Sequence, residues 1–329
     1  MSPFRTSSLF ITSRTAVRAA ARRLARRSAR PVARARARLR SVASGALGLA
    51  SLLAVLGNAR ADATGSEPGG VLQLPPRAEF HLFLLAGQSN MAGRGEVEPS
   101  DKEPIPRVLA LDATGKWVPA RDPIHWDKPV AGVGLARSFA VEYLKSHPGV
   151  TVGFIPAACG GSPISSWAPG QYFDQTNSHP YDDALARSRR ALEVGTLRGI
   201  LWHQGESDSK PELAPQYEAA LTTLLERLRR ELGAPRVPVV IGQLGQFAAV
   251  PWNVPTRAVD AAHRRIAASL PLAAFVHSDG LASNPDNIHF SAAALREFGR
   301  RYAEAFDALE RKTSTAKKPS ASAPSAERH

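Results

Sequence analysis

The sequence is almost free of cysteine, since Cys159 is the only one among its 329 residues. A single thiol excludes an intrachain disulfide and any zinc cluster that is built on cysteines. No HExxH motif and no other His/Cys ligand spacing is present either. We therefore expect neither a metal ion nor another cofactor, and we interpret Cys159 as a small buried residue.

Motifs of several common enzyme classes are also missing. There is no G-x-S-x-G segment, which excludes the nucleophile elbow of the α/β-hydrolases. The glycines at 132 and 134 lack the third glycine of a dinucleotide-binding turn, and Gly115-Lys116 is followed by Trp117, unlike a phosphate loop. The sequence thus gives no support to nucleotide chemistry.

Acidic residues and lysine are absent from residues 1–61, which hold thirteen arginines. That number equals the formal net charge of the whole chain, +13 at pH 7. The rest of the chain has 29 basic and 29 acidic residues, and residues 62–310 are slightly acidic, with 24 basic against 28 acidic. This balance does not indicate a phosphate-binding face, so we expect no nucleic acid among the partners.

The arginine-rich segment has the order of an export signal. Its charged part ends at Arg40, an uncharged apolar run follows at 41–57, and Ala59-Arg60-Ala61 fits the small-x-small cleavage pattern. We expect cleavage after Ala61 and a periplasmic or extracellular protein without stable membrane insertion. A retained anchor and a soluble basic arm are the alternatives.

Composition divides the remaining chain into three parts. Residues 62–78 are rich in glycine and proline and are predicted to be a linker, and residues 311–329 are predicted to be a disordered basic tail. Residues 79–310 have the length of one α/β domain with its own core. No signal indicates a particular oligomeric state.

Short apolar runs alternate with helical patterns in this domain. The runs are at 80–86, 152–157, 199–202, 237–241 and 273–277, and the helical patterns are at 134–146, 182–194, 211–232, 257–269 and 291–309. Nearly continuous apolar strands are typical of a sheet that is covered on both faces. The sequence therefore predicts a three-layer α/β/α sandwich with a parallel sheet, whose reactive loops lie at the carboxyl ends of the strands.

Three polar segments follow predicted strands, at 87–91, 159–162 and 203–208, and the loop after the strand at 273–277 runs to a fourth at 286–289. Their residue types suit acyl transfer. Ser89 is a candidate nucleophile, which needs a base to take its proton, and His289 is the candidate base. Asp286 lies three residues earlier and can hold the imidazole in the tautomer that leaves its other nitrogen free. Backbone N–H groups of Ser89 and of Gly160 or Gly161, with the side-chain amide of Gln204, could stabilise an oxyanion.

The same segments carry a family resemblance. FLLAGQSNMAGRG (83–95), ACGGSPISSW (158–167), WHQGESD (202–208) and DNIHFS (286–291) resemble the blocks of the SGNH hydrolase superfamily. Within it they are most similar to carbohydrate esterase family 6 and the sialate O-acetylesterase domain. The resemblance covers about residues 79–305. It implies a flavodoxin-like three-layer fold, no metal, and hydrolysis of O-acetyl esters on sugars, of the acetylxylan or sialic-acid type.

The resemblance also implies that Ser89 is the nucleophile, that His289 is the base, and that Ser89, one glycine of the 160–161 pair and Gln204 stabilise the oxyanion. Asp286 and Glu206 are both candidates for the acid that orients the histidine, and the spacing favours Asp286. Weaker candidates for substrate contact are Gln88, Asn90 and Trp167. Two other functions remain open, namely an esterase for lipid or other non-sugar acyl esters and a catalytically silent glycan-binding module.

Overall fold

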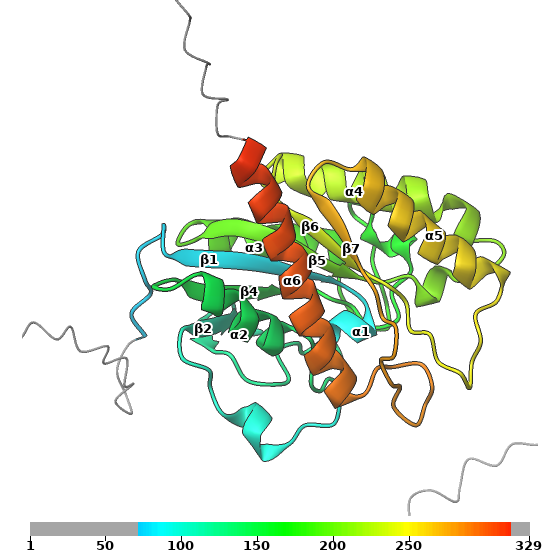
Figure 1. Ribbon diagram of the computed structural model, residues 1–329, viewed down its shortest axis with the longest axis horizontal. Helices are drawn as coiled ribbons and strands as arrows, with labels where there is room; N and C mark the ends of the chain where they lie inside the picture. The colour runs from blue at the N-terminus through cyan, green and yellow to red at the C-terminus, as the bar shows by residue number, and fades with distance from the viewer. Residues whose placement is uncertain (1–71, 317–329) are drawn as a thin grey trace, which may run out of the picture. The chain divides into compact units, whose positions relative to one another are not determined.

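The computed structural model describes residues 72–316 (Figure 1). The predicted export signal lies outside the described residues, as do residues 62–71 of the predicted linker and 317–329 of the predicted tail. Among the helices of residues 72–316, none combines the length and the apolar composition that a membrane span requires.

A seven-stranded sheet with the order β3-β2-β4-β1-β5-β6-β7 forms the middle layer. Its strands are β1 (Phe80–Gly87), β2 (Val108–Leu111), β3 (Trp117–Pro119), β4 (Thr151–Pro156), β5 (Thr196–His203), β6 (Val239–Gly242) and β7 (Ala273–Val276). All neighbouring strands are parallel except β2 and β3, which pair antiparallel at one edge. The strands β4-β1-β5-β6-β7 follow the flavodoxin-like order, in which ligands bind at the carboxyl end of the first strand, where the winding reverses.

Burial explains why β1 occupies the centre of this sheet. All eight of its residues, FHLFLLAG, are buried. Alternate side chains of a strand point to opposite faces, and accordingly Leu82 and Leu84 enter one apolar core while Phe83 and Leu85 enter the other. A strand with two apolar faces is stable only between two layers of helices, so the sequence of β1 requires the three-layer arrangement.

Helices cover both faces of the sheet. They are α1 (Ser89–Ala92), α2 (Ala136–Ser146), α3 (Pro180–Leu192), α4 (Tyr217–Glu231), α5 (Val254–Ser269) and α6 (Ala292–Ala316), and short 3-10 turns lie at Pro99–Lys102, Ile164–Trp167, Glu206–Asp208 and Ala214–Gln216. Buried side chains of α3, α4 and α5 belong to the core that contains Leu82. Those of α2 and α6 belong to the core that contains Phe83, and Figure 1 shows both helices in front of the sheet.

The predicted three-layer α/β/α fold is confirmed, and every predicted strand and helix is present. The antiparallel hairpin of β2 and β3 at the edge of the sheet was not predicted. The helix that the sequence places at 211–232 begins at Tyr217, after a 3-10 turn over Ala214–Gln216. These differences leave the carboxyl edge of the sheet unchanged.

Both ends of the domain extend further than the composition indicates. Leu74 packs against the apolar core and the backbone carbonyl of Arg77 accepts a hydrogen bond from the Thr196 side chain, so this part of the predicted linker belongs to the domain. The prediction of disorder from residue 311 is wrong for residues 311–316, which continue α6. Leu309 is buried on that helix, and packing of its preceding turns explains why the helix continues into a polar stretch.

Candidate active site

Ser89 begins the one-turn helix α1 directly after β1. The chain turns sharply there because Gly87 has a φ of 136°, and a Cβ at this position would lie 2.1 Å from the carbonyl oxygen of His203. Only glycine tolerates both conditions. The turn places Ser89 at the carboxyl edge of the sheet, with 6% of its surface exposed.

Ser89, His289 and Asp286 form a continuous chain of hydrogen bonds. The Asp286 carboxylate accepts from Nδ1–H of His289 at 2.6 Å, so Nε2 of the same ring accepts from the Ser89 hydroxyl at 2.8 Å. Burial raises the pKa of Asp286, but hydrogen bonds from His289 and from the Ile288 backbone outweigh it, and its pKa lies below the usual range. The carboxylate therefore stays ionised and fixes the tautomer that keeps Nε2 free to accept a proton.

Glu206 contacts a different set of groups. Its carboxylate accepts from the Asn90 side chain at 2.6 Å and lies 3.6 Å from Nε2 of His203. Burial raises the pKa of Glu206, but His203 and Asn90 outweigh it and lower the pKa overall. No hydrogen bond or ion pair within residues 72–316 joins Glu206 to His289. Of the two candidate acids, Asp286 is the one that contacts the His289 ring within residues 72–316.

Two backbone N–H groups of the predicted oxyanion set are free of protein acceptors in the described part of the chain. Within residues 72–316, the N–H groups of Ser89 and of Gly161 donate to no protein acceptor. The N–H of Gly160 donates to Asp127 at 2.8 Å. The structure therefore separates the two glycines that the sequence leaves as alternatives, because only Gly161 keeps a donor for a ligand.

Gln204 does not present its amide to this site, which corrects the expectation that it supplies an oxyanion donor. The residue is fully buried. Its Nε2 donates to the Ser162 carbonyl at 3.1 Å and to the Asp208 carboxylate at 2.5 Å, and its Oε1 accepts from the Tyr217 hydroxyl. An amide nitrogen has two donors, so both are already used.

The three weaker candidates for substrate contact are also engaged within the protein. Gln88 is 3% exposed, and its side-chain carbonyl faces the N–H groups of Gly205 and Ser207. Asn90 is 1% exposed and joins Glu206 to the backbone of residues 288–290. Trp167 is 1% exposed and packs edge-on against Trp202. These side chains hold the loops together and leave no face for a sugar.

Asp127 and Asn284 lie against the site, although sequence reasoning did not single them out. Asp127 lies in a loop between β3 and α2 and contacts Arg94, which follows α1. Asn284 donates to the Arg94 carbonyl at 2.7 Å. Arg94 belongs to the GRG segment of the first block, but no local pattern marks Asp127 or Asn284, because their contacts are made across the fold.

A groove of about 780 Å³ lies beside Asp127. This residue accepts a hydrogen bond from the loop that contains Gly160 and Gly161, here called the glycine loop. Residues 118–129 form much of the wall of the groove, and Asp127 belongs both to this wall and to the contacts of Gly160. Trp126 is 37% exposed on the same wall, and the Arg187 guanidinium lies 5.2 Å from the centre of its ring. Ser89 and His289 do not line this groove, which reaches the loop of Gly160 and Gly161 through Asp127.

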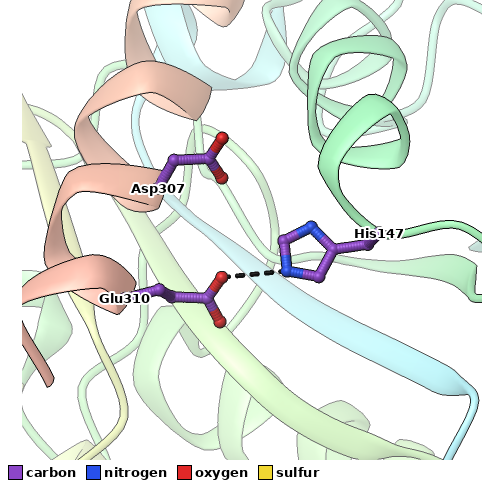
Figure 2. Close-up of side chains that lie close together, drawn as sticks. All are labelled: His147, Asp307 and Glu310. Atoms are coloured by element: carbon purple, nitrogen blue, oxygen red, sulfur yellow. Dashed lines mark hydrogen bonds and ion pairs between the residues drawn. The ribbon is translucent and has the colours of Figure 1, made fainter. Parts of the chain in front are cut away.

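Within the described residues, one group of potential metal ligands converges, namely His147, Asp307 and Glu310 (Figure 2). It joins the end of α2 to α6 at the amino edge of the parallel strands, away from Ser89. Nε2 of His147 lies 3.0 Å from the Glu310 carboxylate, whose other oxygen lies 2.6 Å from the Arg198 guanidinium. Glu310 thus pairs with His147 and with Arg198 of β5, and Asp307 beside them accepts a hydrogen bond from the Ser146 hydroxyl.

Taken together, the flavodoxin-like sheet and the Ser-His-Asp hydrogen bonds at its carboxyl edge define a protein of the SGNH hydrolase class. Residues 79–308 match the family described as "Carbohydrate esterase, sialic acid-specific acetylesterase". The chain belongs to this family and is a carbohydrate esterase.

Similar proteins agree with this placement. The probable carbohydrate esterase At4g34215 of Arabidopsis thaliana is 29% identical over 254 residues, which cover 71% of this chain and 91% of that protein. The X-ray structure of that Arabidopsis protein matches with a TM-score of 0.62 and 27% identity, over 71% of this chain and 99% of its own. The structure of NanS matches with a TM-score of 0.60 and 20% identity, over 73% and 100%. A carbohydrate acetylesterase from Xanthomonas citri matches with a TM-score of 0.56 and 20% identity, over 70% and 57%. At 20% identity the last two show the fold alone.

Proposed function

We propose that this protein removes O-acetyl groups from carbohydrates through an acyl-enzyme on Ser89. The observation that carries the proposal is the unbroken set of hydrogen bonds from Ser89 through His289 to Asp286. A serine hydroxyl is a weak nucleophile until a base takes its proton, and this arrangement supplies the base together with the group that orients it.

In the first half of the proposed reaction, Oγ of Ser89 forms a bond to the acetyl carbonyl carbon while its proton passes to Nε2 of His289. The carbonyl oxygen becomes an oxyanion, which the N–H groups of Ser89 and Gly161 stabilise. Collapse of this intermediate breaks the bond to the sugar oxygen, which takes the proton from His289. The products are the deacetylated sugar and acetyl-Ser89.

In the second half, a water molecule attacks the acetyl carbon of acetyl-Ser89. His289 takes a proton from the water and returns it to Oγ of Ser89 as acetate leaves. The proposed steps need no cofactor. The Asp286 carboxylate stabilises the charged imidazole in both halves, and its lowered pKa keeps it ionised during the cycle.

The substrate class follows from the family, whose description names sialic acid. We propose an acetylated sugar of the sialic-acid or acetylxylan type as the substrate. An esterase for lipid or other non-sugar esters would keep the same residues, whereas a silent glycan-binding module would bind sugars and release no acetate.

Acetate release from O-acetylated sialic acid, acetylated xylan and longer-chain esters tests the proposal. The wild-type protein should release acetate from an acetylated sugar fastest, and Ser89→Ala should release none while it stays folded. Ser188→Ala is the matched control, because this serine is buried on α3 and its hydroxyl contacts no partner among the described residues. Faster hydrolysis of long-chain esters would contradict the carbohydrate assignment.

We further propose that residues 1–61 direct export and are removed after Ala61. The order of arginines, apolar run and small residues supports this proposal. The mature protein would then start at Asp62 and act in the periplasm or outside the cell. N-terminal sequencing of the protein from the periplasmic or culture fraction should find Asp62, and a protein that keeps residues 1–61 in the cytosolic fraction would contradict it.

A further inference from the structure

Arg94 and Asp127 form a buried ion pair directly behind the glycine loop. Their side chains are 6% and 3% exposed, and the Arg94 guanidinium lies 2.7 Å from Oδ2 of Asp127. The same carboxylate oxygen accepts the N–H of Gly160 at 2.8 Å. Burying both charges costs solvation free energy, so a pair at this place calls for an explanation beyond stability.

Three loops of the proposed active site meet at Arg94. Its NH1 donates to the Gly93 carbonyl at 2.7 Å, and the Gly93 N–H donates to the Ser89 carbonyl, which connects Arg94 to the nucleophile turn. Its NH2 reaches the glycine loop through Asp127. The Arg94 carbonyl accepts from the Asn284 side chain, and the Asn284 N–H donates to the His289 carbonyl at 2.7 Å.

The glycine at position 160 is needed for this close approach. A Cβ at Gly160 would lie 2.3 Å from NH2 of Arg94 and 2.6 Å from Oδ2 of Asp127. The next residue, Gly161, has a φ of 88°, which favours glycine, and its N–H is free of protein acceptors within the described residues. The orientation of the Gly161 N–H is therefore set by a backbone whose preceding N–H is held by Asp127.

We propose that the Arg94–Asp127 pair positions the oxyanion donors. Asp127 holds the Gly160 N–H and thereby directs the Gly161 N–H toward the carbonyl oxygen of the substrate, and Arg94 fixes that loop relative to Ser89 and His289. The inference rests on the proposed function, since it concerns the same reaction. Arg94 and Asp127 are positioning residues, because they act through the donors and do not touch the reacting atoms.

Asp127→Asn tests this proposal, with Asp101→Asn as the matched control. Asp101 makes the same kind of contacts, since its carboxylate accepts the Glu98 N–H at 2.8 Å and contacts Arg296 at 2.7 Å, but it lies outside the contacts of Ser89 and Gly161. Both variants remove one charge from an Asp–Arg pair that also binds a backbone N–H. A purely structural role predicts similar effects of the two substitutions.

We expect Asp127→Asn to lower kcat about 100-fold while KM changes by less than about threefold, because a displaced donor stabilises the transition state less. The pH at which activity is half-maximal should stay the same, since His289 and Asp286 are untouched. Arg94→Lys keeps the positive charge but loses the two separate guanidinium contacts. Its kcat should lie between those of Asp127→Asn and the wild type. Asp101→Asn should keep the wild-type kcat. All rates are compared at a temperature where circular dichroism shows that each variant is fully folded.

Methylboronic acid gives a readout that does not depend on turnover, because its adduct with Ser89 carries a tetrahedral oxygen in the position of the oxyanion. Its Kd should rise in Asp127→Asn by about the same factor as kcat falls. Equal kcat in Asp127→Asn and the wild type, equal losses in Asp127→Asn and Asp101→Asn, or a displaced pH midpoint would overturn the proposal. Should the wild-type protein release no acetate, the proposed function fails, and the boronate comparison still decides the role of Asp127.

Discussion

Asp286 and Glu206 are both carboxylates beside a histidine, but each contacts a different ring. Asp286 hydrogen-bonds His289 and thereby reaches Ser89, whereas Glu206 lies against His203 and Asn90. Sequence spacing favours Asp286, and in the structure the three-residue separation brings its carboxylate onto the imidazole. Glu206 instead braces the Asn90 side chain, which in turn accepts the Phe290 N–H beside His289.

Substitution of the two acids should separate these roles. Asp286→Asn should lower kcat by about 10³–10⁴, because an amide no longer fixes the tautomer or stabilises the imidazolium. Glu206→Gln should lower kcat much less and should instead lower the melting temperature, since it weakens a buried contact. Steady-state kinetics with an activated acetyl ester decides between them. A larger loss of kcat in Glu206→Gln would mean that the assignment of Asp286 is wrong.

Gln204 shows where inference from a motif fails at the residue scale. The motif places a polar amide at the end of β5, but the sequence does not tell that Ser162 and Asp208 take both of its donors. Asp127 was missed for the same reason, because the partners of both side chains come from segments that are distant in sequence. Ser89, His289 and Asp286 were found because their motif residues lie in loops that follow predicted strands.

Gln204→Ala should therefore act on stability. Removal of the amide leaves the Asp208 carboxylate and the Ser162 carbonyl without a buried donor, which should lower the free energy of unfolding by about 1–3 kcal/mol. Turnover of the folded fraction should stay within about threefold of the wild type, since the proposed oxyanion donors are backbone groups. Urea unfolding and kinetics on the same samples measure both quantities. If turnover instead fell about 100-fold or more at unchanged stability, Gln204 would return to the oxyanion set.

At the scale of elements, the sequence predicts the long and buried ones best. The nearly continuous apolar run of β1, whose eight residues are all buried, indicates a strand between helix layers, and the leucine periodicity of α4 indicates a helix with one apolar face. Length does not explain why β2 was missed, because it has four residues like the predicted strands β6 and β7. The end of α6 was mistaken for a tail because its composition is polar, although its preceding turns pack against α2.

The network of His147, Asp307 and Glu310 where α2 meets α6 gives a prediction at this scale (Figure 2). Burial raises the pKa of Asp307, although the Ser146 hydroxyl partly offsets this effect, and Oδ1 of Asp307 has no hydrogen-bond partner among the described residues. Asp307→Asn should raise the free energy of unfolding at pH 8 by about 1 kcal/mol, because it removes a poorly satisfied charge.

The gain in Asp307→Asn should shrink as the pH falls, since protonation then neutralises the aspartate of the wild type as well. Thermal unfolding at pH 4 and pH 8 measures it. A destabilised Asp307→Asn variant at pH 8 would show that the charge of Asp307 supports the packing of α6 on α2.

Buried acids make the stability of the whole molecule depend on pH. Burial raises the pKa of Asp122 to about 7, although Arg137 partly offsets this effect. The side chain is 2% exposed. Because the pKa of Asp122 is higher in the folded state, the carboxyl group stays protonated up to a higher pH in the folded protein than in the unfolded chain. Stability from this group is therefore complete below about pH 4 and is lost as the pH rises to about 7.

Asp122→Asn should flatten this part of the pH profile and raise the free energy of unfolding above pH 7 by on the order of 1–4 kcal/mol. Asp112→Asn is the control, because hydrogen bonds from Lys116 and Thr114 lower the pKa of Asp112, so its loss cannot flatten the same interval. Chemical unfolding at half-unit steps from pH 4 to pH 8 measures the difference. Parallel profiles of Asp122→Asn and the wild type would contradict the prediction.

The central claim about the whole molecule is that an acetyl group from a carbohydrate becomes bound to Ser89. Rapid acid quenching of the protein with O-acetylated sialic acid, followed by mass spectrometry of the peptides, tests it most directly. The peptide that contains Ser89 should gain the mass of one acetyl group, and the corresponding peptide of Ser89→Ala should not. Acetate release by the wild type with no acetyl group on Ser89, or equal release by Ser89→Ala, would contradict this claim.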